Sequence, residues 1–357
     1  DAVVREMALK SIQKMVYDNS AEGEQGRAEA CRLMGEVYQP EFSAHLDKLI
    51  REDSSTHVIH EAMAAAGKRK YPEVVGQIVS RLGRKDTRGR AREALIEYGE
   101  LAVKGLSTAL LDSSVARDVR LNIPRTLSKI HSQAAMNVLL KALLQEDRSL
   151  RFQAVHALEE MARHFADLTV DRGIVESAIM SDATLYNRRF VFFVALFGQQ
   201  EKPLPQEESP LYFGLTNSMD RVKERVIWLL SLIYPAKDIR RFWAALNSEE
   251  PNKKADAVEF LDNLLTGEIK AYAFPLFSDA PQAQRFRASL GFLSVNSIDT
   301  VSALRALLDQ DDIWLRAATV WEIGIRRLTG FRDQIVKFLD SDEIVLREAA
   351  GKAINDI

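Results

Sequence analysis

The stretch Arg151-Phe-Gln-Ala154-Val-His-Ala157-Leu158 contains the pattern that decides the fold of this 357-residue chain. A basic residue is followed at positions +3, +6 and +7 by small or apolar side chains. The pattern begins again at Arg27 and Arg347, and weaker copies begin at Arg5, Ile59 (without the basic residue), Arg88, Arg120, Arg189, Arg225, Lys254, Arg287 and Arg316. Eight of the eleven intervals between successive copies are 29 to 33 residues long. We therefore expect a tandem array of similar structural units.

A period of this length accommodates two short helices and two turns, and such a hairpin cannot bury its apolar face without neighbours. The predicted fold class is all-α: a right-handed α-solenoid (superhelix) of helical hairpins. Because the pattern crosses every plausible domain boundary, we expect one solenoid over residues 1–357 with about eleven repeats.

Apolar residues at three-to-four spacing predict the helices of each hairpin. First helices are expected at 40–50, 71–83, 132–145, 298–310 and 331–339, and second helices at 28–38, 88–98, 150–165, 221–233, 255–265 and 313–328. Acidic turn residues are expected to cap second helices by accepting hydrogen bonds from free amides; these are Asp86, Asp112, Asp147, Asp312 and Asp342. Arginines near these turns should reach an aspartate of the same or an adjacent repeat, which predicts a ladder of charge contacts.

Three intervals depart from the period. Only 22 residues separate Arg5 from Arg27, so residues 1–20 are expected to form a truncated first repeat or a linker helix. The chain begins at Asp1 without a methionine, and we expect it to be a piece of a longer protein.

The other two irregular intervals are longer than the period: 38 residues after Arg151 and 36 residues after Arg189. The second contains three prolines among polar residues, which cannot continue a helix. We therefore expect a hinge or irregular region near 199–210.

Composition excludes several classes of protein. Lys plus Arg total 48 and Asp plus Glu 51, so the net charge of −3 gives no uniform positive field for general nucleic-acid binding. The single cysteine, Cys31, allows neither an intramolecular disulfide nor zinc ligation by several thiolates, and it fits a reducing, cytoplasmic location. The longest apolar runs, 190–198 and 226–234, are about half of the roughly 20 residues that a membrane span needs. We expect no membrane insertion of this chain.

The repeat unit, with its acidic turn, basic residue and alanines at +3 and +6, resembles the HEAT repeats of bacterial proteins, of the type that includes phycobilin-lyase-like repeats. The resemblance covers most of the chain and implies an α-solenoid of HEAT-like hairpins.

Three segments are similar to the HEAT region that some bacterial proteins carry after a membrane domain similar to ATP/ADP translocases, sometimes with a cyclic-nucleotide-binding domain. They are Ala257-Val-Glu-Phe-Leu261-Asp-Asn-Leu-Leu265, Pro275-Leu-Phe277 and Asn122-Ile-Pro124-Arg125-Thr-Leu127. This likeness implies a cytosolic accessory domain attached to a membrane domain outside the chain, and it assigns no transport step to these residues.

Motifs of catalysis are scarce. The sequence contains no Gly-x-Gly-x-x-Gly, no phosphate-binding Gly-Lys-Ser/Thr, no His-Glu-x-x-His and no Gly-x-Ser-x-Gly. His156, Glu160 and His164 are spaced to present metal ligands on one helical face, but this spacing is more often a solvated stripe. His57, His60 and Glu61 have the wrong order for a zinc protease. We therefore predict no enzymatic activity, catalytic residue, cofactor or metal site.

A dense basic region supplies the first candidate binding surface. Nine basic residues lie between positions 68 and 92, and we select Lys68, Arg69, Lys70, Arg84 and Lys85 as candidate binding residues. They could bind phosphate, nucleic acid or an acidic membrane leaflet. The favoured alternative is a set of ordinary solvated turns around the repeat arginine. Tyr71 and Tyr98 are the only aromatic residues nearby, which disfavours binding of single-stranded nucleic acid.

An aromatic block supplies the second candidate surface. It contains Tyr186, Phe190, Phe192, Phe193 and Phe197, next to Arg188 and Arg189. Such a stripe is more often an ordinary part of the core. Five aromatic side chains nevertheless exceed what one helix face can bury, so we select Phe190, Phe192 and Arg188 as candidate residues of a partly exposed groove for a partner peptide. Phe193 and Phe197 are expected in the core. We also expect all four tryptophans, Trp228, Trp243, Trp314 and Trp321, to be core residues.

The function that these observations favour is a non-catalytic protein-interaction scaffold, because solenoids bind through long surfaces and distributed contacts. Its expected partner is a protein segment or a sister domain of the same polypeptide. The alternative is a HEAT-type enzyme or DNA-binding module that acts on tetrapyrrole attachment or alkylated DNA through a basic groove. The basic region and the tryptophans lie far apart in sequence, which disfavours this alternative.

Overall fold

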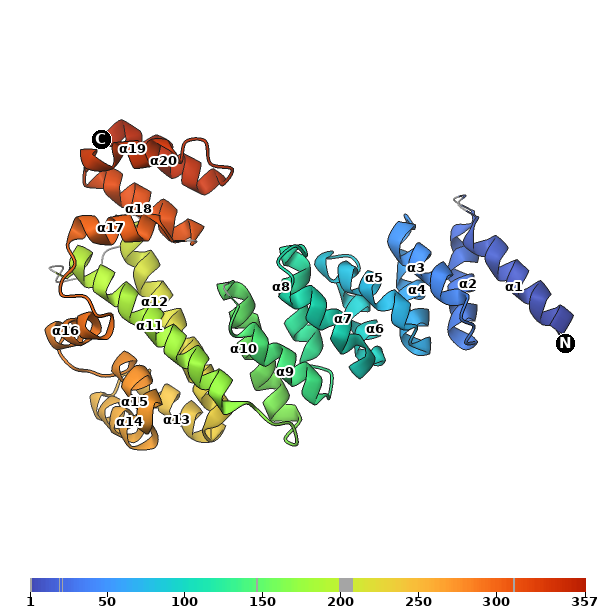
Figure 1. Ribbon diagram of the computed structural model, residues 1–357, viewed down its shortest axis with the longest axis horizontal. Coiled ribbons are helices and arrows are strands. Elements are labelled where there is room, and N and C mark those ends of the chain that lie inside the picture. Colours follow the sequence, from blue (N-terminus) through green and yellow to red (C-terminus); the bar gives the residue numbers. More distant parts are fainter. Residues whose placement is uncertain (1, 19, 21, 146, 199–207, 311) are drawn as a thin grey trace. The chain divides into compact units, whose positions relative to one another are not determined.

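The computed structural model describes residues 2–18, 20, 22–145, 147–198, 208–310 and 312–357. Every regular element in these ranges is a helix, and none of the described residues belongs to a strand (Figure 1). The chain divides into two compact units, residues 1–175 and 176–357. The prediction of an all-α fold built from stacked helices is therefore confirmed. The prediction that one solenoid runs through residues 1–357 stays a prediction.

Unit 1 is a stack of helical hairpins with two layers. The first layer contains α1 (Ala2–Val16), α3 (Phe42–Glu52), α5 (Val75–Ser80), α7 (Glu100–Leu111) and α9 (Gln133–Ala142). The second contains α2 (Glu24–Glu36), α4 (Thr56–Arg69), α6 (Arg88–Tyr98), α8 (Arg117–Leu127) and α10 (Arg148–His164). Two 3-10 turns, η1 (Pro72–Val74) and η2 (Arg81–Gly83), flank α5. Each helix contacts its hairpin partner and the next helix of its own layer, so successive repeats share a continuous core.

Unit 2 contains two longer helices, α11 (Arg172–Phe197), which begins in unit 1, and α12 (Pro210–Ile233). They are followed by α13 (Ala236–Leu246), α14 (Pro251–Leu264), α15 (Gly267–Ala273), η3 (Phe274–Leu276), α16 (Gln282–Phe292), α17 (Thr300–Leu308), α18 (Ile313–Ile325), η4 (Thr329–Phe331), α19 (Arg332–Val336) and α20 (Ile344–Asp356). The lengths of α11 and α12 account for the two long intervals in the repeat pattern. The helix expected at 221–233 is the second half of α12.

Small residues of the repeat pattern allow neighbouring second-layer helices to approach closely. The alanine at +6 packs against a glycine at +8 of the adjacent repeat. A Cβ added at Gly35 would lie 3.3 Å from Ala65, and one added at Gly324 would lie 2.9 Å from the Cα of Ala353. Ala65 and Ala353 are both buried. The alanines are therefore part of the seam between repeats, where larger side chains do not fit.

In several repeats the basic residue that opens the pattern binds backbone carbonyls at the end of the preceding helix or in the turn that follows it. Arg120 Nε donates to the carbonyl of Leu110 at 3.0 Å, and Arg316 Nε donates to Gln310 at 3.0 Å. Arg347 Nη1 donates to Ser341 at 2.6 Å. Leu110 lies in the last turn of α7, where carbonyls lack intrahelical partners and carry the negative end of the helix dipole, so the guanidinium group of Arg120 satisfies it well.

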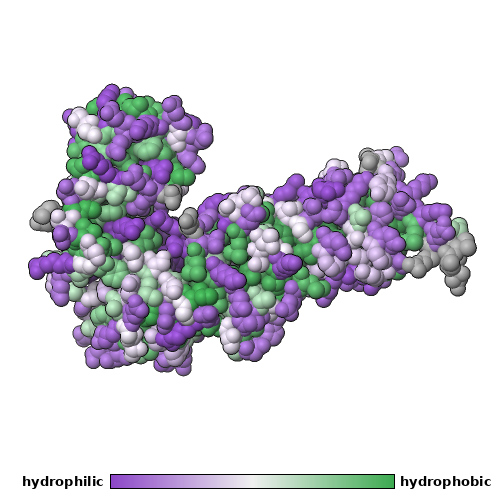
Figure 2. Space-filling model, in the orientation of Figure 1, coloured by the Kyte–Doolittle hydropathy of each residue, from purple (hydrophilic) through white to green (hydrophobic). Residues whose placement is uncertain are grey.

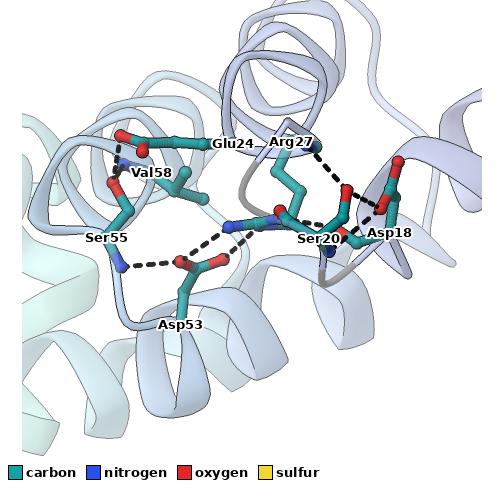
Figure 3. A network of polar contacts seen from close by, with 8 residues as sticks. Asp18, Ser20, Glu24, Arg27, Asp53, Ser55 and Val58 are labelled. Atoms are coloured by element: carbon teal, nitrogen blue, oxygen red, sulfur yellow. Dashed lines mark hydrogen bonds and ion pairs between the residues drawn. The ribbon is translucent and has the colours of Figure 1, made fainter.

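Arg27 shows the same arrangement and adds a contact to the next repeat (Figure 3). Its guanidinium group donates to the carbonyls of Asp18 and Ser20 and forms a buried ion pair with Asp53, with Nε and Oδ2 2.7 Å apart. Asp53 also accepts a hydrogen bond from the backbone amide of Ser55, the N-cap residue of α4. The predicted charge ladder between repeats is confirmed at this joint.

The predicted aspartate caps are confirmed at two of the five positions. Asp147 accepts hydrogen bonds from the first amides of α10 and pairs with Arg117 of the preceding repeat at 2.9 Å. Asp312 caps α18 through the amide of Leu315. The prediction is wrong for Asp86, Asp112 and Asp342, because α6, α8 and α20 have other N-cap residues whose side chains form no capping hydrogen bond.

Two expectations concern the irregular parts of the chain. Residues 199–207 of the predicted hinge region lie outside the described residues; Ser209 caps α12, and Pro210 is its first residue. Within residues 1–20, α1 packs against α2 and α3 as the first helix of a hairpin.

Among the described residues, no helix is both long and apolar enough to cross a membrane.

Candidate functional site

A surface groove with a volume of about 740 Å³ lies in unit 2. It lies between α12, α13, the start of α14 and the segment 276–278. Its lining consists of charged and amide side chains together with apolar ones: Asn217, Asp220, Arg221, Lys223, Glu224, Trp243, Leu246, Asn247, Lys254, Leu276, Phe277 and Ser278.

The walls of the groove are fixed by local packing. In α13, Ile239 and Phe242 are buried and Arg240 is exposed, so the helix turns one apolar face towards the core. The ring of Phe242 meets the ring of Phe277 edge-on, with centroids 5.4 Å apart. This contact holds the segment 276–278 against α13. Pro251 starts α14 at a position where its missing amide hydrogen costs nothing.

Lys223 is the chemically unusual residue of the groove. Its side chain is half-buried, and its ammonium group lies 5.6 Å from the ring centre of Tyr186. Burial lowers the pKa of Lys223; Asp220 raises it and Arg285 lowers it further. No carboxylate among the described residues forms an ion pair with this ammonium group. A half-buried cation that forms no ion pair with a described residue is favourably placed to receive a carboxylate from a ligand.

The rest of the groove combines apolar surface with further charges. Trp243 and Leu246 are partly exposed on α13 and lie on the same wall, and Arg221 and Lys254 add two exposed cations. Asp220 and Glu224 balance part of this positive charge. The arrangement can therefore accommodate an apolar side chain next to a single acidic group, as a peptide provides.

The structure does not support the expected exposure of Phe190 and Phe192. Both rings are 5 % exposed, so they belong to the core. Phe192 joins the hydrophobic cluster that α11, α12, α17 and α18 share, and Arg285 of α16 stacks on Phe190 at 4.5 Å. Because α11 is covered on several sides, it buries more aromatic rings than one face could. Arg188 is exposed. The expectation of a core position is confirmed for Phe197, whereas Phe193 is partly buried and packs against the cluster.

The candidate basic residues divide into paired and unpaired groups. Lys68 pairs with Glu36 at 2.6 Å, Arg84 pairs with Asp86 at 3.1 Å, and Arg69 donates to the carbonyls of Gly35 and Glu36 at the end of α2. These side chains therefore serve contacts within unit 1. Lys70 and Lys85 are exposed and form no ion pair with any described residue. Their role in binding stays a proposal.

The prediction that all tryptophans are core residues is wrong for Trp314, which is 72 % exposed near the start of α18. Trp228, Trp243 and Trp321 are only partly buried. The ammonium group of Lys352 lies over the indole ring of Trp321, 3.7 Å from the ring centre. The sequence around a tryptophan does not show which face of a short helix lacks a packing partner, so the exposure of Trp314 could not be predicted.

The sequence interpretation missed the groove. The available signal was the alternation of charges at Asp220, Arg221, Lys223 and Glu224 beside an apolar helix face, and this pattern is typical of any solvated helix. The groove also needs Trp243 and Phe277, which come from other segments.

The spaced histidines of α10 are engaged in local contacts. Glu160 accepts a hydrogen bond from Ser128 and pairs with Lys129 at 2.6 Å, and His164 Nδ1 lies 2.8 Å from the carbonyl oxygen of Glu160. No group of three or more His, Cys, Asp or Glu side chains among the described residues could hold a metal ion.

The stacked helices define a helical-repeat fold, and unit 2 contains a surface groove lined by charged and apolar side chains. No protein-family model and no curated protein matches the chain. A structural comparison matches the crystal structure of Kap121p, with 13 % identity, a TM-score of 0.26 and coverage of 98 % of this chain and 52 % of the other. It also matches a homology model of the full-length AP-3 complex in an intermediate open conformation, with 14 % identity, a TM-score of 0.19 and coverage of 93 % and 55 %. The chain spans about half the length of these proteins.

Proposed function

We propose that this chain is a non-catalytic protein-interaction scaffold that holds a short segment of a partner protein in the groove of unit 2. The observation that carries the proposal is the position of Lys223, a half-buried cation without an ion pair among the described residues, beside the apolar wall of Trp243. Apolar burial gives affinity, and a single charge-assisted contact gives direction to a bound peptide.

The charges of the groove limit the kind of segment that fits. Asp220 and Glu224 repel a strongly acidic ligand, while Lys223 favours one carboxylate. The preferred segment therefore carries an aromatic or aliphatic side chain next to one aspartate or glutamate. On the face seen in Figure 2, hydrophilic residues cover much of the surface and hydrophobic residues lie between them.

The partner in this proposal is a segment of another protein or of a sister domain in the same polypeptide. Similarity of the segments 257–265 and 275–277 to the HEAT region of bacterial translocase-like proteins supports a cytosolic accessory role beside a membrane domain. Leu276 and Phe277, from the second of these segments, line the groove. Attachment to a transporter is thus part of the proposal.

Selection of peptides from a phage-displayed random library on the full chain tests this function. We expect enriched sequences that place an apolar residue next to an acidic one. Binding of a selected peptide should weaken about tenfold in the Lys223→Gln variant, because a charge-assisted contact is lost. It should also weaken in Trp243→Ala.

Arg240→Gln is the matched control, since Arg240 is an exposed cation of α13 outside the groove. Circular dichroism checks that each variant keeps its helical content. A library without enrichment, or selected peptides that bind Lys223→Gln as tightly as the unaltered chain, would contradict the proposed function.

A further inference from the structure

Three arginines of unit 1 gather on the adjacent second-layer helices α6 and α8. Arg88 and Arg92 are one turn apart on α6, so they share a face of that helix. Arg92 Nη2 contacts Asn122 Oδ1 of α8 at 3.4 Å, and Arg125 lies three residues after Asn122 on α8. Since α6 and α8 pack against each other, the three guanidinium groups form one cluster.

This cluster contains positive charge without a counter-ion in the described part of the chain. The Nε atoms of Arg88 and Arg92 are buried and have no hydrogen-bond partner among the described residues. None of the three guanidinium groups forms an ion pair with a described carboxylate. Burial lowers the pKa of Arg92, and the charges of Arg125 and Arg88 lower it further. Like charges therefore lie close together in the free protein, and a bound anion would reduce the repulsion between them.

Several other cations of the same basic region are already paired. Lys68, Arg84 and Arg90 have carboxylate partners in Glu36, Asp86 and Glu93. Arg81 is buried and donates to the carbonyls of Ile50 and Arg51 at the end of α3. The cluster of Arg88, Arg92 and Arg125 thus differs from these paired residues in having no such partner among the described residues, and it differs from the separate lysines Lys70 and Lys85 in bringing three cations together.

We propose that Arg88, Arg92 and Arg125 bind an acidic protein segment in which aspartate or glutamate residues are adjacent. A guanidinium group can bind a carboxylate through two parallel hydrogen bonds. Three arginines on two adjacent helices can therefore bind several neighbouring carboxylates at one site. The site lies in unit 1 and is distinct from the groove of unit 2, which favours a single carboxylate.

An acidic peptide fits this surface better than a nucleic acid does. Tyr71 and Tyr98 are each only 1 % exposed, so neither ring is free to stack on a base. The net charge of −3 means that the chain as a whole gives no uniform positive field for general nucleic-acid binding.

Titration of the full chain with a fluorescent oligoglutamate peptide at low salt tests the proposal. Its anisotropy should report saturable binding that weakens as salt is added. In the double variant Arg92→Gln/Arg125→Gln, affinity should fall about tenfold or more. The variant Lys70→Gln/Lys85→Gln removes the same number of charges from exposed, unpaired positions of the same basic region, and it should change affinity by less than about twofold.

The proposal would be overturned by no binding of oligoglutamate at low salt, by equal weakening in both double variants, or by tighter binding of a single-stranded oligothymidylate. Inorganic phosphate should compete only weakly, and displacement of the peptide by phosphate alone at equal concentration would also count against it. If the arginine double variant loses helical content, Arg125→Gln alone replaces it, because Arg125 is exposed. Lys223→Gln should bind oligoglutamate normally, which separates this site from the groove.

Discussion

Arg225 and Asp182 form a buried ion pair between α12 and α11. Two parallel hydrogen bonds of 2.6 and 2.7 Å join the guanidinium group to the carboxylate, and both side chains are almost fully buried. In the variant Arg225→Met, Asp182 would remain buried without its partner. We expect a loss of about 3–5 kcal/mol in the free energy of unfolding of unit 2. Urea denaturation followed by circular dichroism measures this loss.

Arg287 provides the matched control, because it opens a repeat in the same way as Arg225 but is exposed and has no ion pair with a described residue. Arg287→Met should change stability by less than about 0.5 kcal/mol. The double variant Arg225→Met/Asp182→Leu should recover part of the loss, since it removes both buried charges. Equal effects of Arg225→Met and Arg287→Met would contradict the importance of the buried pair.

Cys31 gives a second prediction at the scale of single residues. Its thiol is fully buried in α2, and burial raises the pKa of Cys31 above its ordinary value. Because only the thiolate reacts, the folded chain should keep an unreactive thiol even at mildly alkaline pH. Labelling with Ellman's reagent should be roughly a hundredfold slower or more in buffer than in urea, where the thiol is exposed. Similar rates in the two conditions would show that α2 opens readily.

Two glycines in contacting helices of unit 2 test the packing of repeats at the scale of helices. A Cβ at Gly324 of α18 would lie 2.9 Å from the Cα of Ala353 in α20, whereas a Cβ at Gly351 of α20 would meet nothing within 4 Å. Gly324→Ala should therefore destabilise by about 1–3 kcal/mol, because α18 and α20 must separate. Gly351→Ala should stabilise by about 0.5–1 kcal/mol, since alanine favours the helix. Thermal unfolding of both variants measures these opposite signs.

Helices of regular repeats could be predicted closely from the sequence, because their pattern is local. The expected helix 88–98 has the observed bounds of α6, and 150–165 corresponds to α10. The long helix α11 was not recognised, since the signature at Arg189 has the same local spacing whether it opens a hairpin or lies inside one helix.

Burial and the candidate site depend on contacts between distant segments, which no local pattern contains. Phe190 is buried because Arg285 covers it, and the groove exists because Phe277 packs against Phe242. The cluster of arginines could be predicted only in part. Arg88 and Arg92 belong to the recognised basic region, but Arg125 joins them through the packing of α8 on α6.

The two units differ in the sequence distance over which their polar contacts act. In unit 1, contacts between repeats join residues about one repeat apart, as in Lys68 with Glu36 and Lys129 with Glu160. In unit 2, Ser209 donates to Glu322 across 113 residues, and Ser289 donates to Asn187 across 102. Nearest-neighbour contacts let a stack open repeat by repeat, whereas long-range contacts couple distant helices into one cooperative block.

We therefore expect different patterns of hydrogen exchange in the two units. Under mild denaturant, the helices of unit 1 should open with graded free energies that change from one repeat to the next, because each contacts mainly its neighbours. Helices α11, α12, α17 and α18 of unit 2 should exchange together, since they share one hydrophobic cluster and the buried contact between Ser209 and Glu322. Mass spectrometry of exchanged peptides measures both patterns. Glu322→Gln should lower protection throughout this block by about 1–2 kcal/mol while leaving α2 and α4 unchanged. A single opening free energy for all helices of the chain would contradict the division.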